Sequence, residues 1–165
     1  MMNSKSTLAL LLTLIAPVAA PLAAQSTETT PGQELSDLIF GSIGDGSTAE
    51  IDMGQFVDFG RSIFTSIDSN EDGAIAQGEF IEWDFGFEFI ADEKGQQQAF
   101  QAGRNILFAN WDRNSDGTID LREYHRAMAW DYRRADTNDD AFLSREEFLR
   151  GYTVIKTYRA ALSEQ

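Results

Sequence analysis

Residues 112–123, with the sequence DRNSDGTIDLRE, constrain this chain more than any other stretch. Five of them can present oxygen atoms to one centre, through three alternating side chains, a backbone carbonyl and a closing carboxylate. In chain order they are Asp112, Asn114, Asp116, Thr118 and Glu123. Gly117 stands where the chain must turn back sharply, and glycine adopts the positive φ of such a turn without steric cost.

This donor set suits one kind of metal ion. Ca²⁺ takes six to eight oxygen ligands in proteins, whereas Zn²⁺ favours Cys and His, and neither occurs in the stretch. Asp120 adds an oxygen that can act directly or through a water, and Ile119 faces away from the ion. With its glycine and its closing glutamate at the expected places, the stretch resembles the calcium loop of the EF-hand family. The resemblance implies a helix on each side of the loop and Ca²⁺ as the bound ion.

Two further stretches carry the same pattern, at residues 68–79 (DSNEDGAIAQGE) and 136–147 (DTNDDAFLSREE). The resemblance implies Asp68, Asn70, Asp72, Ala74 and Glu79 as ligands in the first, and Asp136, Asn138, Asp140, Phe142 and Glu147 in the second. Ala74 and Phe142 would act through their backbone carbonyls. The second stretch has Ala141 where glycine is expected. Because a non-glycine residue at positive φ costs about 1 kcal/mol, we expect this loop to bind weakly or to stay empty.

Residues 44–55 match the twelve-residue loop pattern only in part, when Ile51 is aligned with Ile119. Gly44 stands at the place of the first Asp, and Gln55 at the place of the closing Glu. One interpretation is a vestigial EF hand that binds no metal. An ordinary glycine-rich connection accounts for these residues equally well.

The four loops begin at residues 44, 68, 112 and 136, so the intervals are 24, 44 and 24 residues. The short intervals leave room for one helix of ~18 Å between loops, and the long interval leaves room for two. One helix should therefore leave one loop and enter the next, with loops at its opposite ends. The expected pairs are residues 68–79 with 112–123, through Ile75 and Ile119, and residues 44–55 with 136–147, through Ile51 and Leu143. Two separate lobes, each made of consecutive loops, are the alternative.

Apolar residues at helical spacing predict about six helices, so the expected fold is all-α, with EF-hand loops and short β contacts between paired loops. The expected helices cover roughly residues 34–43, 53–67, 80–92, 96–111, 124–135 and 148–162, and the EF-hand domain covers residues 33–162. Residues 83–89 alternate in a way that also suits a strand, and Gly86 weakens a helix there. We favour a helix because one must follow the calcium loop.

The first 24 residues are typical of a secretory signal peptide. Lys5 precedes an apolar run at residues 7–16, which is shorter than the ~20 residues of a membrane span. We expect cleavage after Ala24; an uncleaved anchor is the alternative. Residues 25–32 are expected to be a disordered leader ending near a helix start, with Pro31 in the first turn. The sequence thus predicts export, to a periplasm or to the outside.

The charge of the chain excludes several partners. Its formal net charge is −14, from 13 Lys and Arg and 27 Asp and Glu residues. Nucleic acids and anionic membrane surfaces require a basic patch, so neither is expected as a partner. No enzyme is expected either, because His125 is the sole histidine and the recognisable acid clusters are assigned as ligands.

The sequence therefore predicts calcium binding by an exported protein with a structural or buffering role. The alternative is a sensor or adaptor that binds an unidentified protein partner, as calmodulin or dockerins do. Calmodulin-like sensors use Met-rich grooves, but only Met53 and Met128 remain after residue 24. Dockerin loops usually close with Asp, whereas the loops here close with Glu.

Overall fold

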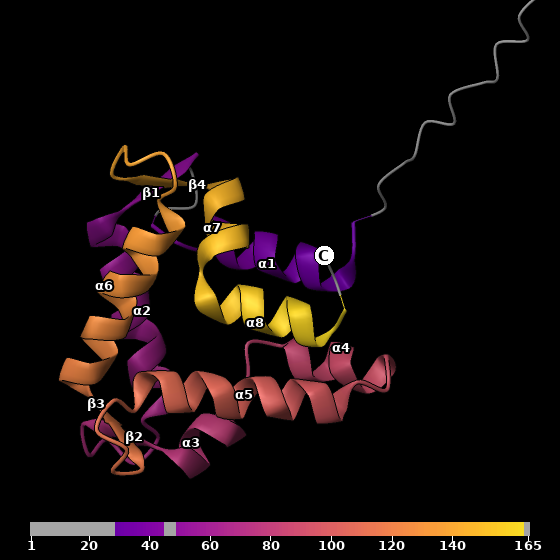
Figure 1. The fold of residues 1–165 in the computed structure, drawn as a ribbon, viewed down its shortest axis with the longest axis vertical. Helices are drawn as coiled ribbons and strands as arrows, with labels where there is room; N and C mark the ends of the chain where they lie inside the picture. Colours follow the sequence, from indigo (N-terminus) through magenta and orange to yellow (C-terminus); the bar gives the residue numbers. More distant parts are fainter. Residues whose placement is uncertain (1–28, 45–48, 164–165) are drawn as a thin grey trace, which may run out of the picture.

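The computed structural model describes residues 29–44 and 49–163, which form eight helices and two small antiparallel sheets (Figure 1). Along the chain these are α1 (Pro31–Gly41), β1 (Glu50–Asp52), α2 (Met53–Ile67), β2 (Ala74–Ala76), α3 (Gln77–Glu82), α4 (Phe87–Glu93), α5 (Gln97–Trp111), β3 (Thr118–Asp120), α6 (Leu121–Ala135), β4 (Phe142–Ser144), α7 (Arg145–Gly151) and α8 (Thr153–Ala161). The predicted all-α class with short β contacts is confirmed. The predicted signal peptide, half of the leader and residues 45–48 of the first loop lie outside the described residues. Pro31 occupies the first turn of α1, and Thr30 caps that helix.

The loops pair as the spacing predicts. β2 pairs with β3, where Ile75 stands opposite Ile119, and β1 pairs with β4, where Ile51 stands opposite Leu143. These four side chains are completely buried. Helices α2 and α6 pack together and carry one loop pair at each end (Figure 1). The two-lobe alternative is wrong.

Two of the six expected helices are each divided in two. The first divides after Glu82, because Gly86 takes φ 100° and the carboxylate of Asp84 accepts hydrogen bonds from the N–H groups of Gly86 and Glu88, 2.7 and 3.1 Å away. That carboxylate caps α4. Periodicity alone gives no sign of this side-chain competitor for backbone N–H groups.

The last expected helix divides at Tyr152, whose backbone is extended at φ −62° and ψ 119°. Gly151 lies directly against Ala135 at the end of α6, where any side chain on residue 151 would collide with the backbone. The break turns the completely buried Tyr152 ring against Phe56 and Phe148, with centroid separations of 5.3 and 5.2 Å. Close packing of α7 on α6 therefore decides where the helix ends.

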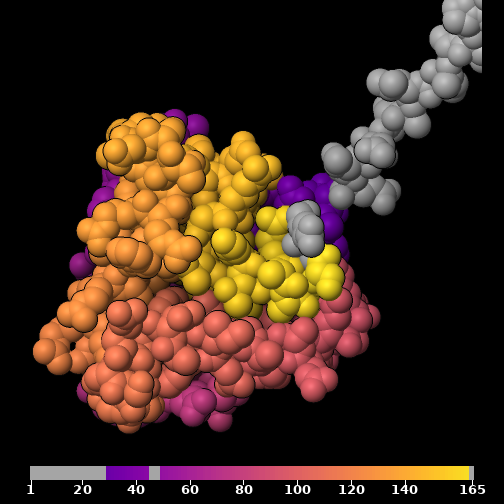
Figure 2. Space-filling view, in the orientation of Figure 1, coloured from indigo at the N-terminus to yellow at the C-terminus, as the bar shows by residue number. Residues whose placement is uncertain are grey.

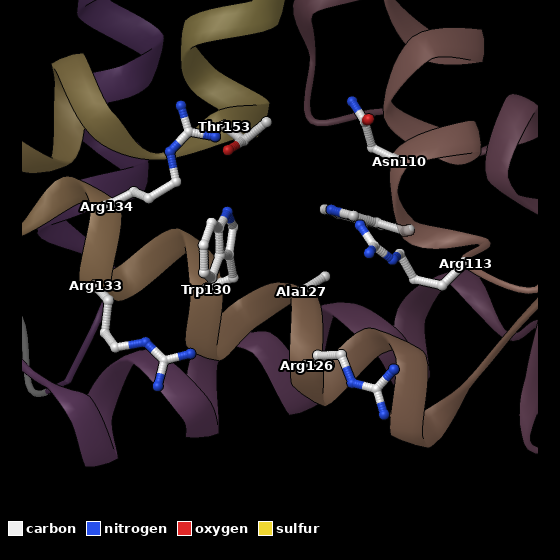
Figure 3. A pocket seen from close by; sticks show the side chains of 9 residues that line it. Asn110, Arg113, Arg126, Ala127, Trp130, Arg133, Arg134 and Thr153 are labelled. Atoms are coloured by element: carbon white, nitrogen blue, oxygen red, sulfur yellow. The ribbon is translucent and has the colours of Figure 1, made fainter.

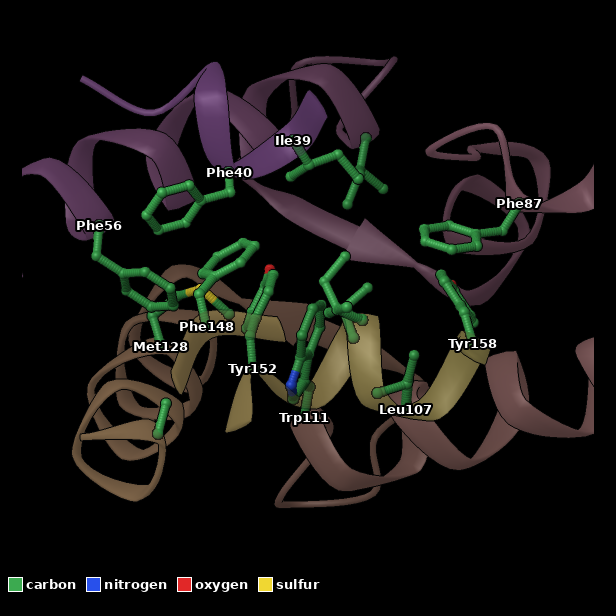
Figure 4. Packing of buried hydrophobic residues seen from close by; sticks show 14 of the residues in the cluster. Ile39, Phe40, Phe56, Phe87, Leu107, Trp111, Met128, Phe148, Tyr152 and Tyr158 are labelled. Carbon is green, nitrogen blue, oxygen red and sulfur yellow. The ribbon is translucent and has the colours of Figure 1, made fainter. Parts of the chain in front are cut away.

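Every one of the eight helices contributes an aromatic ring to the core, beside buried aliphatic side chains (Figure 4). Trp111 packs edge-on against Phe80 and Tyr124, at 5.6 and 5.4 Å between ring centroids. Rings of this size bury large apolar areas and favour such edge-to-face contacts. In the part of the chain that the structure covers, no helix is long and apolar enough to cross a membrane.

One charged side chain is also part of this core. Arg104 of α5 is 1% exposed, and its guanidinium Nη2 donates a hydrogen bond to the carbonyl of Trp83 at 2.7 Å. The same nitrogen lies 3.3 Å from the carboxylate of Glu88, and the guanidinium carbon lies 4.8 Å from the centroid of the Phe100 ring. Arg104 thus ties α5 to the segment between α3 and α4.

A buried carboxylate on α6 gives a testable pH dependence. Asp131 is 4% exposed and accepts a hydrogen bond of 2.5 Å from the Thr153 hydroxyl. Burial raises the pKa of Asp131 to about 6 from an ordinary value of 3.8, although the Thr153 hydrogen bond and the nearby charge of Arg134 oppose the rise. Folded Asp131 therefore binds its proton more tightly than the unfolded chain does, so this group's contribution to stability falls as pH rises from about 4 to about 6.

Asp131→Asn is expected to raise the free energy of unfolding at pH 7 by about 1–3 kcal/mol relative to wild type. The difference between variant and wild type should grow from pH 4 to pH 6 and then level off. Urea unfolding in EDTA at pH 4, 5, 6 and 7 measures it, with the exposed Asp92→Asn as the matched control. A difference that does not change with pH would show that Asp131 is already ionised across this range.

Candidate metal-binding loops

The loop at residues 112–123 wraps around the carboxylate of Asp112. One oxygen of this carboxylate accepts a hydrogen bond from the N–H of Asp116 at 3.1 Å, and the other accepts one from Gly117 at 3.0 Å. Asn114 Oδ1 also accepts from the Asp116 N–H, at 2.8 Å. Asp112 itself is 7% exposed. The first, third and fifth residues of the loop therefore surround one small volume.

Glu123 joins the two ends of this loop. Its Oε1 accepts hydrogen bonds from the N–H groups of Arg113 and Asn114, at 2.9 and 3.0 Å, and its Oε2 accepts one from Asp120 at 3.1 Å. In return, the carboxylate of Asp120 caps α6 by accepting from the Glu123 N–H at 2.8 Å. In this reciprocal capping box, the side chains of Asp120 and Glu123 fix both the start of α6 and the end of the loop.

The loops at 68–79 and 136–147 repeat these contacts. In both, the first Asp accepts from the N–H groups of the fifth and sixth residues at 3.0–3.2 Å. The closing Glu accepts from the second, third and ninth residues at 2.9–3.3 Å. Each third-place Asn also donates to the fifth-place Asp, at 3.0 and 2.8 Å. Three loops with unlike intervening residues thus adopt one geometry.

The structure places the predicted ligands within these three loops. Side-chain candidates are Asp68, Asn70, Asp72, Glu79, Asp112, Asn114, Asp116, Glu123, Asp136, Asn138, Asp140 and Glu147, and the carbonyl candidates Ala74, Thr118 and Phe142 begin strands β2, β3 and β4. The ninth residue of the loop differs among the three loops, and none of the three offers a free side-chain oxygen in the same way. Both oxygens of Asp120 have protein partners, since Oδ2 accepts from Arg122 at 2.8 Å. Ser144 caps α7, and Ala76 has no polar side-chain atom.

The backbone of each loop takes positive φ at two places. The sixth residue has φ of 85°, 89° and 68° at Gly73, Gly117 and Ala141, so the left-handed conformation expected of Ala141 is confirmed. The fourth residue has φ of 59–60° and is Glu71, Ser115 or Asp139. Nothing in the sequence indicates this second place, because no glycine occupies it.

Ala141→Gly should relieve the strain in the last loop. We expect the free energy of unfolding to rise by about 1 kcal/mol, and the calcium affinity of this loop to rise roughly fivefold, because the left-handed backbone suits glycine. Chemical unfolding and calorimetric titration measure these effects. Gly73→Ala is the reverse control, since a Cβ there meets no atom within 4 Å and only the backbone preference changes. Unchanged values in both variants would contradict a cost from the backbone conformation.

Hydrogen bonding keeps several loop carboxylates ionised. The N–H of Ala76 holds the pKa of Glu79 below its ordinary value, and the Thr118 hydroxyl does the same for Asp116. At Glu147, the hydroxyl and N–H of Ser144 lower the pKa to about 2. The loops therefore present anionic oxygens at neutral pH without further change in protonation.

The residues present fit a calcium ion by their chemistry. Each loop combines three carboxylates, one amide oxygen and one backbone carbonyl, an all-oxygen set of the kind Ca²⁺ takes. Among residues 29–44 and 49–163, no three His, Cys, Asp or Glu side chains lie in an arrangement that would itself hold a metal ion. In each loop the carboxylates of the first Asp and of the closing Glu accept hydrogen bonds from backbone N–H groups. Ion binding would therefore require the carboxylates of a loop to converge further on one centre.

The loop at 44–55 differs from the other three. Gln55 keeps the capping role of the closing Glu, since it exchanges hydrogen bonds with Asp52 at 2.9 and 3.0 Å, but it brings no charge. Tyr132 of α6 donates to the carbonyls of Ile51 and Ala141, at 3.1 and 2.7 Å. The segment thus serves as the strand partner of the last loop. Its vestigial origin stays an interpretation, because residues 45–48 lie outside the described residues.

Comparison with known proteins identifies one part of the chain. Residues 106–129 match the family model described as EF hand. The match covers the end of α5, the loop at 112–123 and the first part of α6, and it suggests calcium binding. No curated protein and no solved structure matches the chain.

Proposed function

We propose that this is an exported calcium-binding protein with three EF-hand loops, in which calcium stabilises the fold. The shared hydrogen-bond pattern of residues 68–79, 112–123 and 136–147 carries the proposal. The first two loops form one back-to-back pair through β2 and β3. The third is the weaker site because of Ala141. The signal-like residues 1–24 support export to a periplasm or the outside.

The stabilising effect expected of bound calcium follows from the charges in each loop. Each loop carries three carboxylates, and drawing these like charges onto one centre costs electrostatic repulsion. A bound divalent cation would supply the positive charge that removes this repulsion. Because such a site exists only in the folded chain, binding free energy adds to folding free energy.

A structural role is supported by how α6 is held. Its two ends carry loops that pair with two other parts of the chain, and Tyr124, Met128 and Tyr132 on its inner face are at most 2% exposed. A sensor opens such a face to a partner when calcium binds. Here that face packs against α2 and α7.

A calcium titration of the purified protein tests the proposal. Trp111 is 3% exposed and directly precedes Asp112, so its fluorescence should change and saturate as the loop fills. The titration uses the Trp130→Phe variant, because the fluorescence of Trp130, which is 57% exposed, would otherwise add to the signal of Trp111. We expect a higher melting temperature in calcium and no gain in binding of an apolar dye. The proposal fails without a response at millimolar calcium, and dye binding that rises with calcium would favour a sensor.

A further inference from the structure

A pocket of about 520 Å³ lies beside the loop at 112–123, on the face where α5, α6 and the start of α8 meet (Figure 2). Its lining residues are Asn110, Trp111, Arg113, Arg126, Ala127, Trp130, Arg133, Arg134 and Thr153. Ligand pockets for small molecules have volumes of about 300–1,000 Å³. The pocket is therefore large enough for a ligand with one ring and its substituents.

The charge of this pocket is opposite to that of the chain. Four arginines line it and no carboxylate does, although the chain has a formal net charge of −14. Within the described residues, none of the four has a carboxylate within 4 Å, whereas Arg61, Arg122 and Arg150 each form an ion pair. The buried Asp131 accepts a hydrogen bond from Thr153, which also lines the pocket. Arg113 and Arg126 border a second hollow as well, which Asp120 and Glu123 also line.

Helix electrostatics explains only part of this cluster. Arg133 and Arg134 stand in the last turn of α6, where cations stabilise the negative end of the helix dipole. Arg126 lies in the middle of that helix, and Arg113 lies in the calcium loop, so neither has that role. Their convergence on one pocket needs another explanation.

An exposed indole stands among these cations. Trp130 is 57% exposed, and Figure 3 shows its ring in the middle of the pocket, with Arg134 and Thr153 on one side and Arg113 and Asn110 on the other. The guanidinium of Arg133 lies 6.0 Å from the ring centroid. A large aromatic surface left to water is a favourable place for a flat ligand ring to stack.

We propose that this pocket binds a compact, multiply charged anion that carries a ring, with the ring on Trp130 and phosphate or carboxylate groups on the arginines. Guanidinium groups form paired hydrogen bonds to both kinds of anion. A long polyanion would extend over the acidic remainder of the surface. A compact ligand stays within the basic patch, because screening at physiological salt confines charge effects to about 8 Å.

Titrations of the full chain with phenyl phosphate and with benzene-1,3-dicarboxylate test the proposal. The indole N–H resonance of Trp130, identified by its loss in Trp130→Phe, should shift and saturate with at least one probe at submillimolar Kd. The tighter probe tells phosphate from carboxylate. The shift should weaken at higher salt, and Arg126→Gln should raise Kd at least fivefold while the matched Arg61→Gln leaves it unchanged.

The titrations are run both in EDTA and in calcium, so their outcome is independent of whether the loops bind metal. Benzyl alcohol serves as the uncharged probe. The proposal is overturned by no saturation with either anion up to 10 mM, by equal affinity for benzyl alcohol, or by an unchanged Kd in both Arg126→Gln and Arg134→Gln. Because these arginines are exposed, both variants are expected to keep the fold, which circular dichroism checks.

Discussion

Arg104→Met is expected to lower the free energy of unfolding by about 3 kcal/mol. The substitution keeps much of the apolar stem but removes a buried guanidinium. The carbonyl of Trp83 then loses its 2.7 Å hydrogen bond, and the carboxylates of Asp84 and Glu88 lose their cation. A buried acceptor without a partner costs about 1–3 kcal/mol by itself.

The destabilisation caused by Arg104→Met should be largest near the substituted residue, and hydrogen exchange can measure this. Arg104 holds the segment between α3 and α4, so hydrogen exchange there should accelerate more than in α6. Urea unfolding with and without calcium gives the stability change. Arg61→Met is the matched control, because the Arg61–Asp58 pair is exposed and should contribute less than about 1 kcal/mol. Equal effects of the two substitutions would contradict a structural role for the buried arginine.

Glu123→Gln is expected to reduce calcium affinity at the loop of residues 112–123 by about 100-fold or more, since losing a group that only hydrogen-bonds to a metal ligand already costs about 10–100-fold. The closing carboxylate is the residue expected to give two oxygens to the ion. Its replacement also acts without calcium, because Glu123 is 6% exposed and accepts three backbone hydrogen bonds. Glutamine keeps one acceptor and turns a donor toward an N–H group, so we expect a loss of about 1–3 kcal/mol in EDTA.

Calorimetric titration and Trp111 fluorescence measure the first effect, and unfolding in EDTA measures the second. Glu93→Gln removes the same charge from an exposed position on α4 and should change neither. The loop at 68–79 should weaken as well, because Ile75 and Ile119 couple the two loops through β2 and β3. Wild-type binding in Glu123→Gln would rule out the assignment of this loop as a metal site.

The sequence predicted most of the architecture from loop spacing. The intervals of 24, 44 and 24 residues favoured shared helices over two separate lobes, and the observed pairs Ile75–Ile119 and Ile51–Leu143 confirm that arrangement. The capping residues Asp52, Asp120 and Ser144, each with Gln or Glu three places on, are equally local signals. The metal assignments themselves stay predictions, supported by the geometry of three loops.

Other features could not be predicted from local patterns. Gly86 weakens the expected helix at residues 80–92, but helical periodicity does not show that the Asp84 side chain competes for backbone N–H groups and caps α4. The break at Tyr152 depends on how closely Gly151 approaches Ala135, far away in the sequence. The burial of Arg104 has no signal in the sequence, because no periodicity reveals a carbonyl contributed by a residue 21 places earlier.

The sequence by itself determined the loops and their left-handed turns at the sixth place, and it favoured the shared helices and the pairing that the structure shows. The loops and their turns depend on residues at most a dozen places apart, so short-range geometry is sufficient for them. Only the tertiary structure decided where α7 stops, which arginine is buried, and which four arginines meet around Trp130. Those outcomes depend on contacts between elements, where packing and desolvation act on groups that are distant in the chain.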